Sequence, residues 1–94
     1  MYVIVRTENA GCFAGTANEG LDDFNRITLT GARRLWYWDG AATLSELAQR
    51  GPSKPDKCKF PVEVDSVQLT QVLEVVAVTG EAREAIAKVP VWSA

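Results

Sequence analysis

Apolar and β-branched positions recur in short stretches along the first third of the chain. Residues 2–7 and 12–16 have this character, and between them the turn residues of segment 9–11 predict an opening β-hairpin. A polar, glycine-containing connection over residues 18–23 separates the hairpin from residues 24–30, where apolar and polar positions alternate. The alternation predicts a third strand.

The next β-forming stretch is the most chemically concentrated part of the chain. Residues 34–38 read Arg-Leu-Trp-Tyr-Trp and favour a further strand after a bend at Gly31-Ala32. A period of two places Leu35 and Tyr37 on one face of that strand, and both are expected to contribute to the core. The opposite face then holds Arg34, Trp36 and Trp38.

The second half of the chain mixes helical and extended patterns. A capping-box spacing predicts a short helix over residues 44–50, and proline marks a loop over residues 52–57. Residues 58–64 resemble an irregular edge segment, and the apolar run 67–78 predicts one long bent strand or two. Residues 81–88 are good helix formers and predict a second helix.

The expected fold is α+β and mainly β, a single domain over residues 1–94. It has a small, strongly bent antiparallel sheet or an SH3/Sm-like barrel, with a short internal helix and a C-terminal helix.

Composition narrows the class of protein. The chain has 94 residues, of which 47% are hydrophobic and 23% charged, typical of an ordinary globular domain. No apolar run is long enough to span a bilayer, and the first residues lack the pattern of a signal peptide, so a cytoplasmic location is expected. Cys12 and Cys58 are the only cysteines and are expected to be reduced, without a zinc site.

Charge and residue types point to binding rather than catalysis. The chain contains no histidine, which removes the commonest general base, and no cofactor or metal motif appears, so a non-enzymatic role is favoured. The formal net charge is −2, yet residues 32–62 carry six basic and three acidic side chains. All of the positive excess therefore lies in the segment that contains the aromatic cluster.

Guanidinium groups beside aromatic rings suit a ligand with a phosphate and a stacking base. The candidate ligand-binding residues are Arg33, Arg34, Trp36, Trp38, Lys54, Lys57 and Lys59. Simpler interpretations remain open, because the arginines and lysines can be solvated or ion-paired and the aromatic residues can lie in the core or a subunit interface. Tyr37 and Trp92 are the candidate interface residues.

Two resemblances add context. Residues 11–16, 23–29 and 32–34 resemble the first motif of Sm-like barrels, while the second Sm motif is missing, because Thr79-Gly80 follows the apolar strand in place of Arg-Gly. Across nearly its whole length the chain also resembles a family of small uncharacterised proteins of tailed bacteriophages and prophages. The shared segments are residues 32–41, 58–61 and 90–93. This resemblance implies an accessory phage protein that acts in the cytoplasm of a bacterial host cell.

Three functions remain as hypotheses. The first is a homo-oligomeric protein that binds an anionic small molecule, such as a host immune signal nucleotide, and sequesters it as counter-defence. The second is a protein-protein interaction module whose aromatic residues bind a host or phage partner. The third is a Sm-like protein that binds single-stranded nucleic acid. None of the three involves a membrane.

Overall fold

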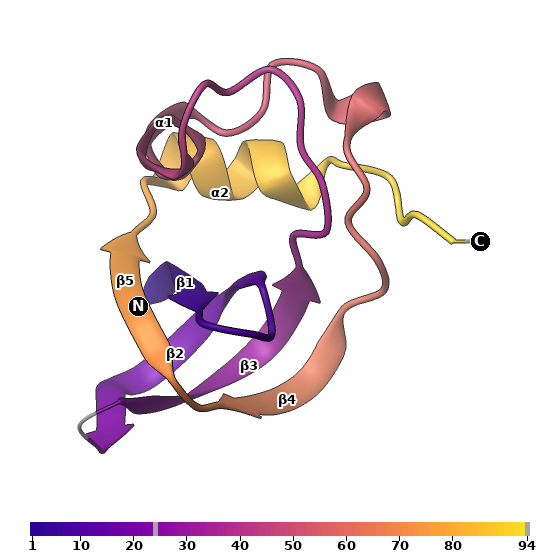
Figure 1. Ribbon diagram of the computed structural model, residues 1–94. Coiled ribbons are helices and arrows are strands. Elements are labelled where there is room, and N and C mark those ends of the chain that lie inside the picture. The colour runs from indigo at the N-terminus through magenta and orange to yellow at the C-terminus, as the bar shows by residue number, and fades with distance from the viewer. Residues whose placement is uncertain (24, 94) are drawn as a thin grey trace.

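The structure, a computed structural model, describes residues 1–23 and 25–93. One five-stranded antiparallel sheet has the strand order β4-β3-β2-β1-β5, and two helices lie on one side of it (Figure 1). The strands are β1 (Tyr2–Thr7), β2 (Cys12–Asp23), β3 (Arg26–Arg34), β4 (Val64–Leu69) and β5 (Val72–Ala77). The helices are α1 (Leu44–Arg50) and α2 (Gly80–Ala87), and a short 3-10 helix, η1, covers Pro55–Lys57.

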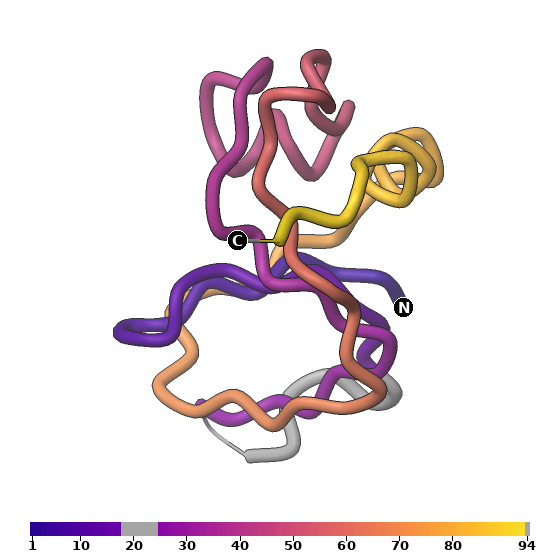
Figure 2. The backbone as a smooth tube through the Cα atoms, turned by 90° about the vertical axis from the view of Figure 1, so that its right-hand side faces the viewer, coloured from indigo at the N-terminus to yellow at the C-terminus, as the bar shows by residue number. Residues whose placement is uncertain are grey.

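The sheet curls strongly, so that its strands trace most of a ring below the helices (Figure 2). β4 and β5 form the two edges and are not paired with each other within the described residues, so the sheet is not closed. The predicted α+β fold with a small, strongly bent antiparallel sheet, a short internal helix and a C-terminal helix is therefore confirmed. The closed barrel that was its alternative is not observed.

At Val3, Ile4 and Val5 of β1 both faces of the curled sheet are buried, which explains the apolar run of this strand. Val3 and Val5 point into the curl, whereas Ile4, between them, points toward the helices. The inner core consists of Val3, Val5, Phe13, Ala17, Ile27, Leu29, Ala32 and Leu69. The outer core consists of Ile4, Ala14, Leu35, Leu47, Ala48, Cys58, Phe60, Ile86 and Val89.

The predicted opening hairpin is present, and its turn is fixed by a threonine. The Thr7 hydroxyl donates to the Gly11 carbonyl at 2.8 Å and accepts from the Ala10 amide at 2.9 Å. Gly11 has a φ of 86°, a conformation that favours glycine. β2 is longer than predicted, because the segment 18–23, expected to be a connection, pairs with the start of β3. Phe24, assigned by the sequence to the third strand, lies outside the described residues.

The helix predictions agree with the structure. The Thr43 hydroxyl accepts from the Glu46 amide at 3.1 Å at the start of α1, and Gly51 ends the helix with a φ of 77°. The apolar run 67–78 forms two strands, β4 and β5, separated at Gln71, which has a φ of 56°. No helix in the described part of the chain is long and apolar enough to cross a membrane.

Candidate functional site

The aromatic segment that follows β3 does not continue the strand. β3 ends at Arg34, which pairs with Phe13 near the start of β2, and the Leu35 amide then donates to the Cys12 carbonyl at 2.8 Å. The predicted strand over residues 34–38 is therefore wrong beyond Arg34. The physical reason is that β2 begins at Cys12, so β3 has no neighbour with which to pair further.

Arg33 is buried, with 6% of its surface exposed, and donates only to backbone carbonyls. Nη1 reaches the carbonyls of Ile86 and Val89, both at 3.0 Å, and Nη2 reaches that of Phe60 at 2.8 Å. Longer bonds from Nε and Nη2 reach the carbonyls of Pro61 and Pro90, at 3.3 and 3.4 Å. Burial lowers the pKa of the guanidinium. Arg33 was predicted to bind a ligand; in the structure its guanidinium joins the end of α2 to the segment that precedes β4.

The bonds of Arg33 also fix the course of the C-terminal segment. Two of its acceptors, Val89 and Pro90, follow α2 directly, and the Trp92 amide donates to the Phe60 carbonyl at 3.0 Å. Trp92 is thereby held beside the segment that leaves β3. Its indole ring stacks on that of Trp36, with ring centroids 6.5 Å apart and an interplanar angle of 6°.

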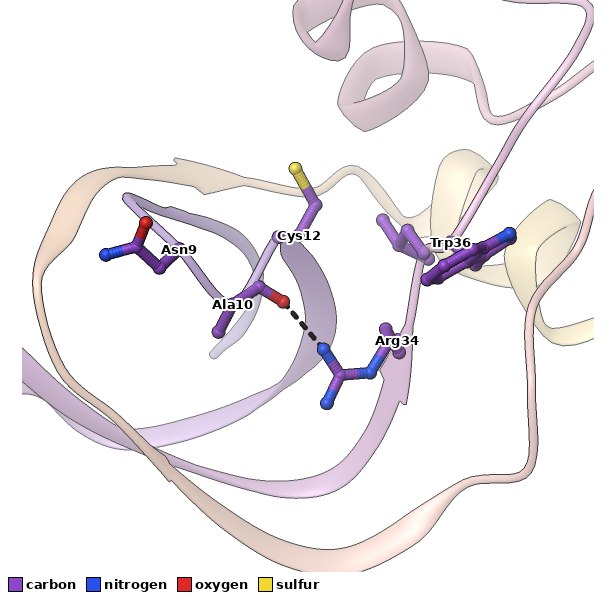
Figure 3. Close-up of a pocket in the computed structure, with 7 residues that line it drawn as sticks. Asn9, Ala10, Cys12, Arg34 and Trp36 are labelled. Atoms are coloured by element: carbon purple, nitrogen blue, oxygen red, sulfur yellow. Dashed lines mark hydrogen bonds between the residues drawn. The ribbon is translucent and has the colours of Figure 1, made fainter.

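Arg34, the next residue, is exposed but held in place. Its guanidinium carbon lies 4.3 Å from the centroid of the Phe13 ring, and Nη1 donates to the Ala10 carbonyl at 2.6 Å. Figure 3 shows the Arg34 side chain reaching toward Ala10, whereas the Trp36 ring points away from Ala10. Nε and Nη2 have no hydrogen-bond partner among the residues that the structure describes.

Two cavities meet at Arg34, the one residue that lines both. The first, of about 300 Å³, is bounded by the β1–β2 turn at residues 9–12 and by residues 34–36. The second, of about 330 Å³, is largely apolar and is bounded by Phe13 and by side chains from residues 61–67. Both volumes fall at the lower end of the range for small-molecule sites. The turn and Phe13 are parts of this site that sequence reasoning missed, although it did identify the turn at Gly11.

The burial of Trp38 and Tyr37 is the reverse of what a strand predicts. Trp38 is half-buried and packs against the outer core, whereas 48% of the Tyr37 surface is exposed. The prediction that Tyr37 contributes to the core is therefore wrong, while the same prediction for Leu35 is confirmed. The alternation fails because Tyr37 belongs to an isolated bridge with Lys59 rather than to β3.

Four exposed residues form what we name the aromatic–lysine surface: Trp36, Tyr37, Lys59 and Trp92. Trp36 is 64% exposed and Trp92 is 37% exposed. The Lys59 Nζ atom lies 5.5 Å from the centroid of the Trp92 ring and 5.9 Å from that of Tyr37, within the range of cation–π interactions. Three chain segments that are distant in the sequence thus meet in one patch.

The other predicted cations lie apart from these contacts. Lys54 and Lys57 are exposed at the two ends of η1, and neither makes a cation–π contact or an ion pair within residues 1–23 and 25–93. Both cysteines are free, and burial raises the pKa of each thiol. The described residues contain no group of three histidine, cysteine or acidic side chains that would hold a metal ion.

The fold and the site define a small α+β protein whose curled sheet presents one fixed arginine between two cavities. Residues 1–86 match the family model of a domain of unknown function, DUF6948, and the chain belongs to this family. Arg33, Arg34 and Lys59 lie within the matched residues, and Trp92 lies beyond them. No curated protein and no solved structure matches the chain.

Proposed function

We propose that the protein binds an anionic small molecule and that Arg34 holds the anionic group. The observation that supports this proposal is the state of the Arg34 guanidinium, which is exposed between two cavities yet fixed by the Phe13 ring and the Ala10 carbonyl. Because this side chain is already ordered, binding of a ligand costs little further conformational entropy. The site is therefore prepared for an anion.

The free edge of the guanidinium defines the chemistry of that anion. With Nη1 bound to Ala10, the Nε and Nη2 groups remain, and they lie on the edge that forms two parallel bonds to a carboxylate or phosphate. The positive excess of residues 32–62 favours the same class of ligand. In the setting that the phage resemblance implies, binding without chemical conversion sequesters a signal nucleotide of the host.

Calorimetry with inorganic pyrophosphate and a panel of nucleotides, including cyclic dinucleotides, tests the proposal. Replacing Arg34 by glutamine removes charge-assisted bonds of about 1.5–3 kcal/mol, which corresponds to a roughly 10- to 150-fold weaker Kd. Arg50→Gln is the matched control, because Arg50 is an exposed arginine on α1 that pairs only with Glu46 in the described structure. Absence of binding to every anion by well-folded protein, or equal losses in both variants, would contradict the proposal.

A further inference from the structure

The aromatic–lysine surface adjoins the Arg34 site, because Trp36 belongs to both. We infer that this surface is the base-binding half of the same site. The ligand is then a nucleotide whose phosphate lies at Arg34 and whose base stacks on the Trp36 and Trp92 rings. This inference rests on the proposed function of Arg34 and adds a requirement for a planar ring in the ligand.

The arrangement of the two tryptophan rings supports stacking. They are 56 residues apart in the sequence, yet they are parallel within 6° and both are exposed. Nucleic bases bind to proteins by lying flat on such rings, and tryptophan offers the largest face. Trp36 follows Arg34 by two residues and lines the same cavity, and its ring lies against Trp92 rather than against Arg34. A ligand with its phosphate at the guanidinium would therefore extend along the cavity to place its base on the rings.

The backbone that carries Trp92 is also held in place, as a prepared binding surface requires. The Trp92 amide is bonded to the Phe60 carbonyl, and the buried Arg33 holds the carbonyls of Val89 and Pro90 just before it. Arg33 is in this sense a positioning residue for Trp92. An exposed indole ring on a fixed backbone, which is not packed into the core, points to a stacking partner outside the chain.

Lys59 supplies a second positive charge beside the rings of Trp92 and Tyr37. Its Nζ atom lies within 6 Å of both the Trp92 and Tyr37 centroids. Together, the Arg34 site and the aromatic–lysine surface hold a guanidinium, two stacked indole rings, an ammonium group and a phenol ring. A protein partner needs exposed apolar rings but has no need for parallel rings that have cations nearby. A nucleotide uses both kinds of group, because its base stacks on a ring and its phosphate pairs with a cation.

Three probes test the inference: inorganic pyrophosphate, ADP and a short single-stranded oligothymidylate. We expect ADP to bind at least tenfold more tightly than pyrophosphate and to quench tryptophan fluorescence. Trp92→Ala and Trp36→Ala should each abolish this advantage, while the control Val91→Ala, which changes an exposed neighbour, retains it. Tighter binding of the oligonucleotide than of ADP, with a steep dependence on salt, would identify a polymer rather than a free nucleotide as the source of the base and phosphate.

The outcomes separate this inference from the proposal on which it rests. If pyrophosphate binds through Arg34 and ADP binds no more tightly, the base-binding role is overturned and the anion site stands. If none of the probes binds, both are overturned. A stable dimer in light scattering, with Trp36 and Trp92 shielded from acrylamide in the ligand-free protein, also overturns the inference, because a second copy of the chain then covers the rings. Circular dichroism shows whether each variant is folded. Trp36→Ala and Trp92→Ala test the base-binding role at two independent positions.

Discussion

Replacing Arg33 by methionine tests the role that the structure gives to this residue. The change keeps an unbranched apolar stem and removes every donor of the guanidinium. The carbonyls of Phe60, Ile86 and Val89, which accept from Arg33 at 2.8–3.0 Å, then lose these bonds inside the protein. Arg34→Met is the matched control, because the adjacent arginine is exposed and has one hydrogen bond, to Ala10.

The expected loss of stability follows from the three short bonds. A hydrogen bond to a charged donor contributes about 1.5 kcal/mol at the lower end of its range, so three contribute about 4.5 kcal/mol. The buried methionine side chain recovers about 1.5 kcal/mol of this through apolar contact. The free energy of unfolding should therefore fall by about 3 kcal/mol, and the melting temperature by roughly 12–24 °C for a domain of this size.

Urea denaturation followed by circular dichroism measures the loss, and hydrogen exchange at the Trp92 amide reports on the C-terminal segment separately. We expect faster exchange at Trp92 in Arg33→Met, because the carbonyls of Val89 and Pro90 are released. Arg34→Met should cost under about 1 kcal/mol and leave the exchange unchanged. A loss below about 1 kcal/mol in Arg33→Met, or equal losses in the two variants, would refute the reasoning.

Three further predictions concern stability. Gly51→Ala should cost at least about 2 kcal/mol more than Gly11→Ala in urea denaturation, because a Cβ at Gly51 meets the Ala85 Cβ whereas one at Gly11 meets nothing within 4 Å. Equal costs would contradict the clash. Burial raises the pKa of the Cys58 thiol, so its contribution to stability is present below the unfolded pKa, about 8.5, and is lost as pH rises through the folded pKa. The free energy of unfolding should thus fall above about pH 8.5, and less steeply in Cys58→Ala. Parallel pH profiles of the original chain and the variant would contradict this role of Cys58. Trp38→Ala should lower the free energy of unfolding by about 3 kcal/mol, since Trp38 packs on the outer core, and a change under about 1 kcal/mol in urea denaturation would exclude that role.

The strands and helices were largely predictable because their signals are local. The alternation in β3, the threonine and glutamate at the start of α1 and the turn at Gly11 each act over a few residues. The end of β3 could not be predicted from local signals, because it depends on another strand. Leu35, Trp36 and Tyr37 all favour strands, but a strand continues only as far as a neighbour pairs with it, and β2 begins at Cys12.

The candidate site was predictable in its residue types but not in its grouping. Arg34, Trp36 and Lys59 were named from the sequence, whereas the stacking of Trp36 on Trp92 depends on a contact between segments 56 residues apart. No local pattern encodes that contact. It depends on where α2 ends, on the bonds from Arg33 to the carbonyls beyond it, and on the bridge that places Phe60 beside Val91.

The two adjacent arginines show how the curled sheet assigns opposite roles to similar residues. Consecutive side chains of a strand point to opposite faces, so Arg33 and Arg34 must face different surroundings. The helices cover the face of Arg33, where buried carbonyls at the end of α2 need donors, and a guanidinium supplies them. The face of Arg34 opens between the β1–β2 turn and the inner core, where one carbonyl and one ring fix the side chain and leave an edge free. The two arginines are adjacent in the sequence, and the position of α2 buries Arg33 while Arg34 remains exposed.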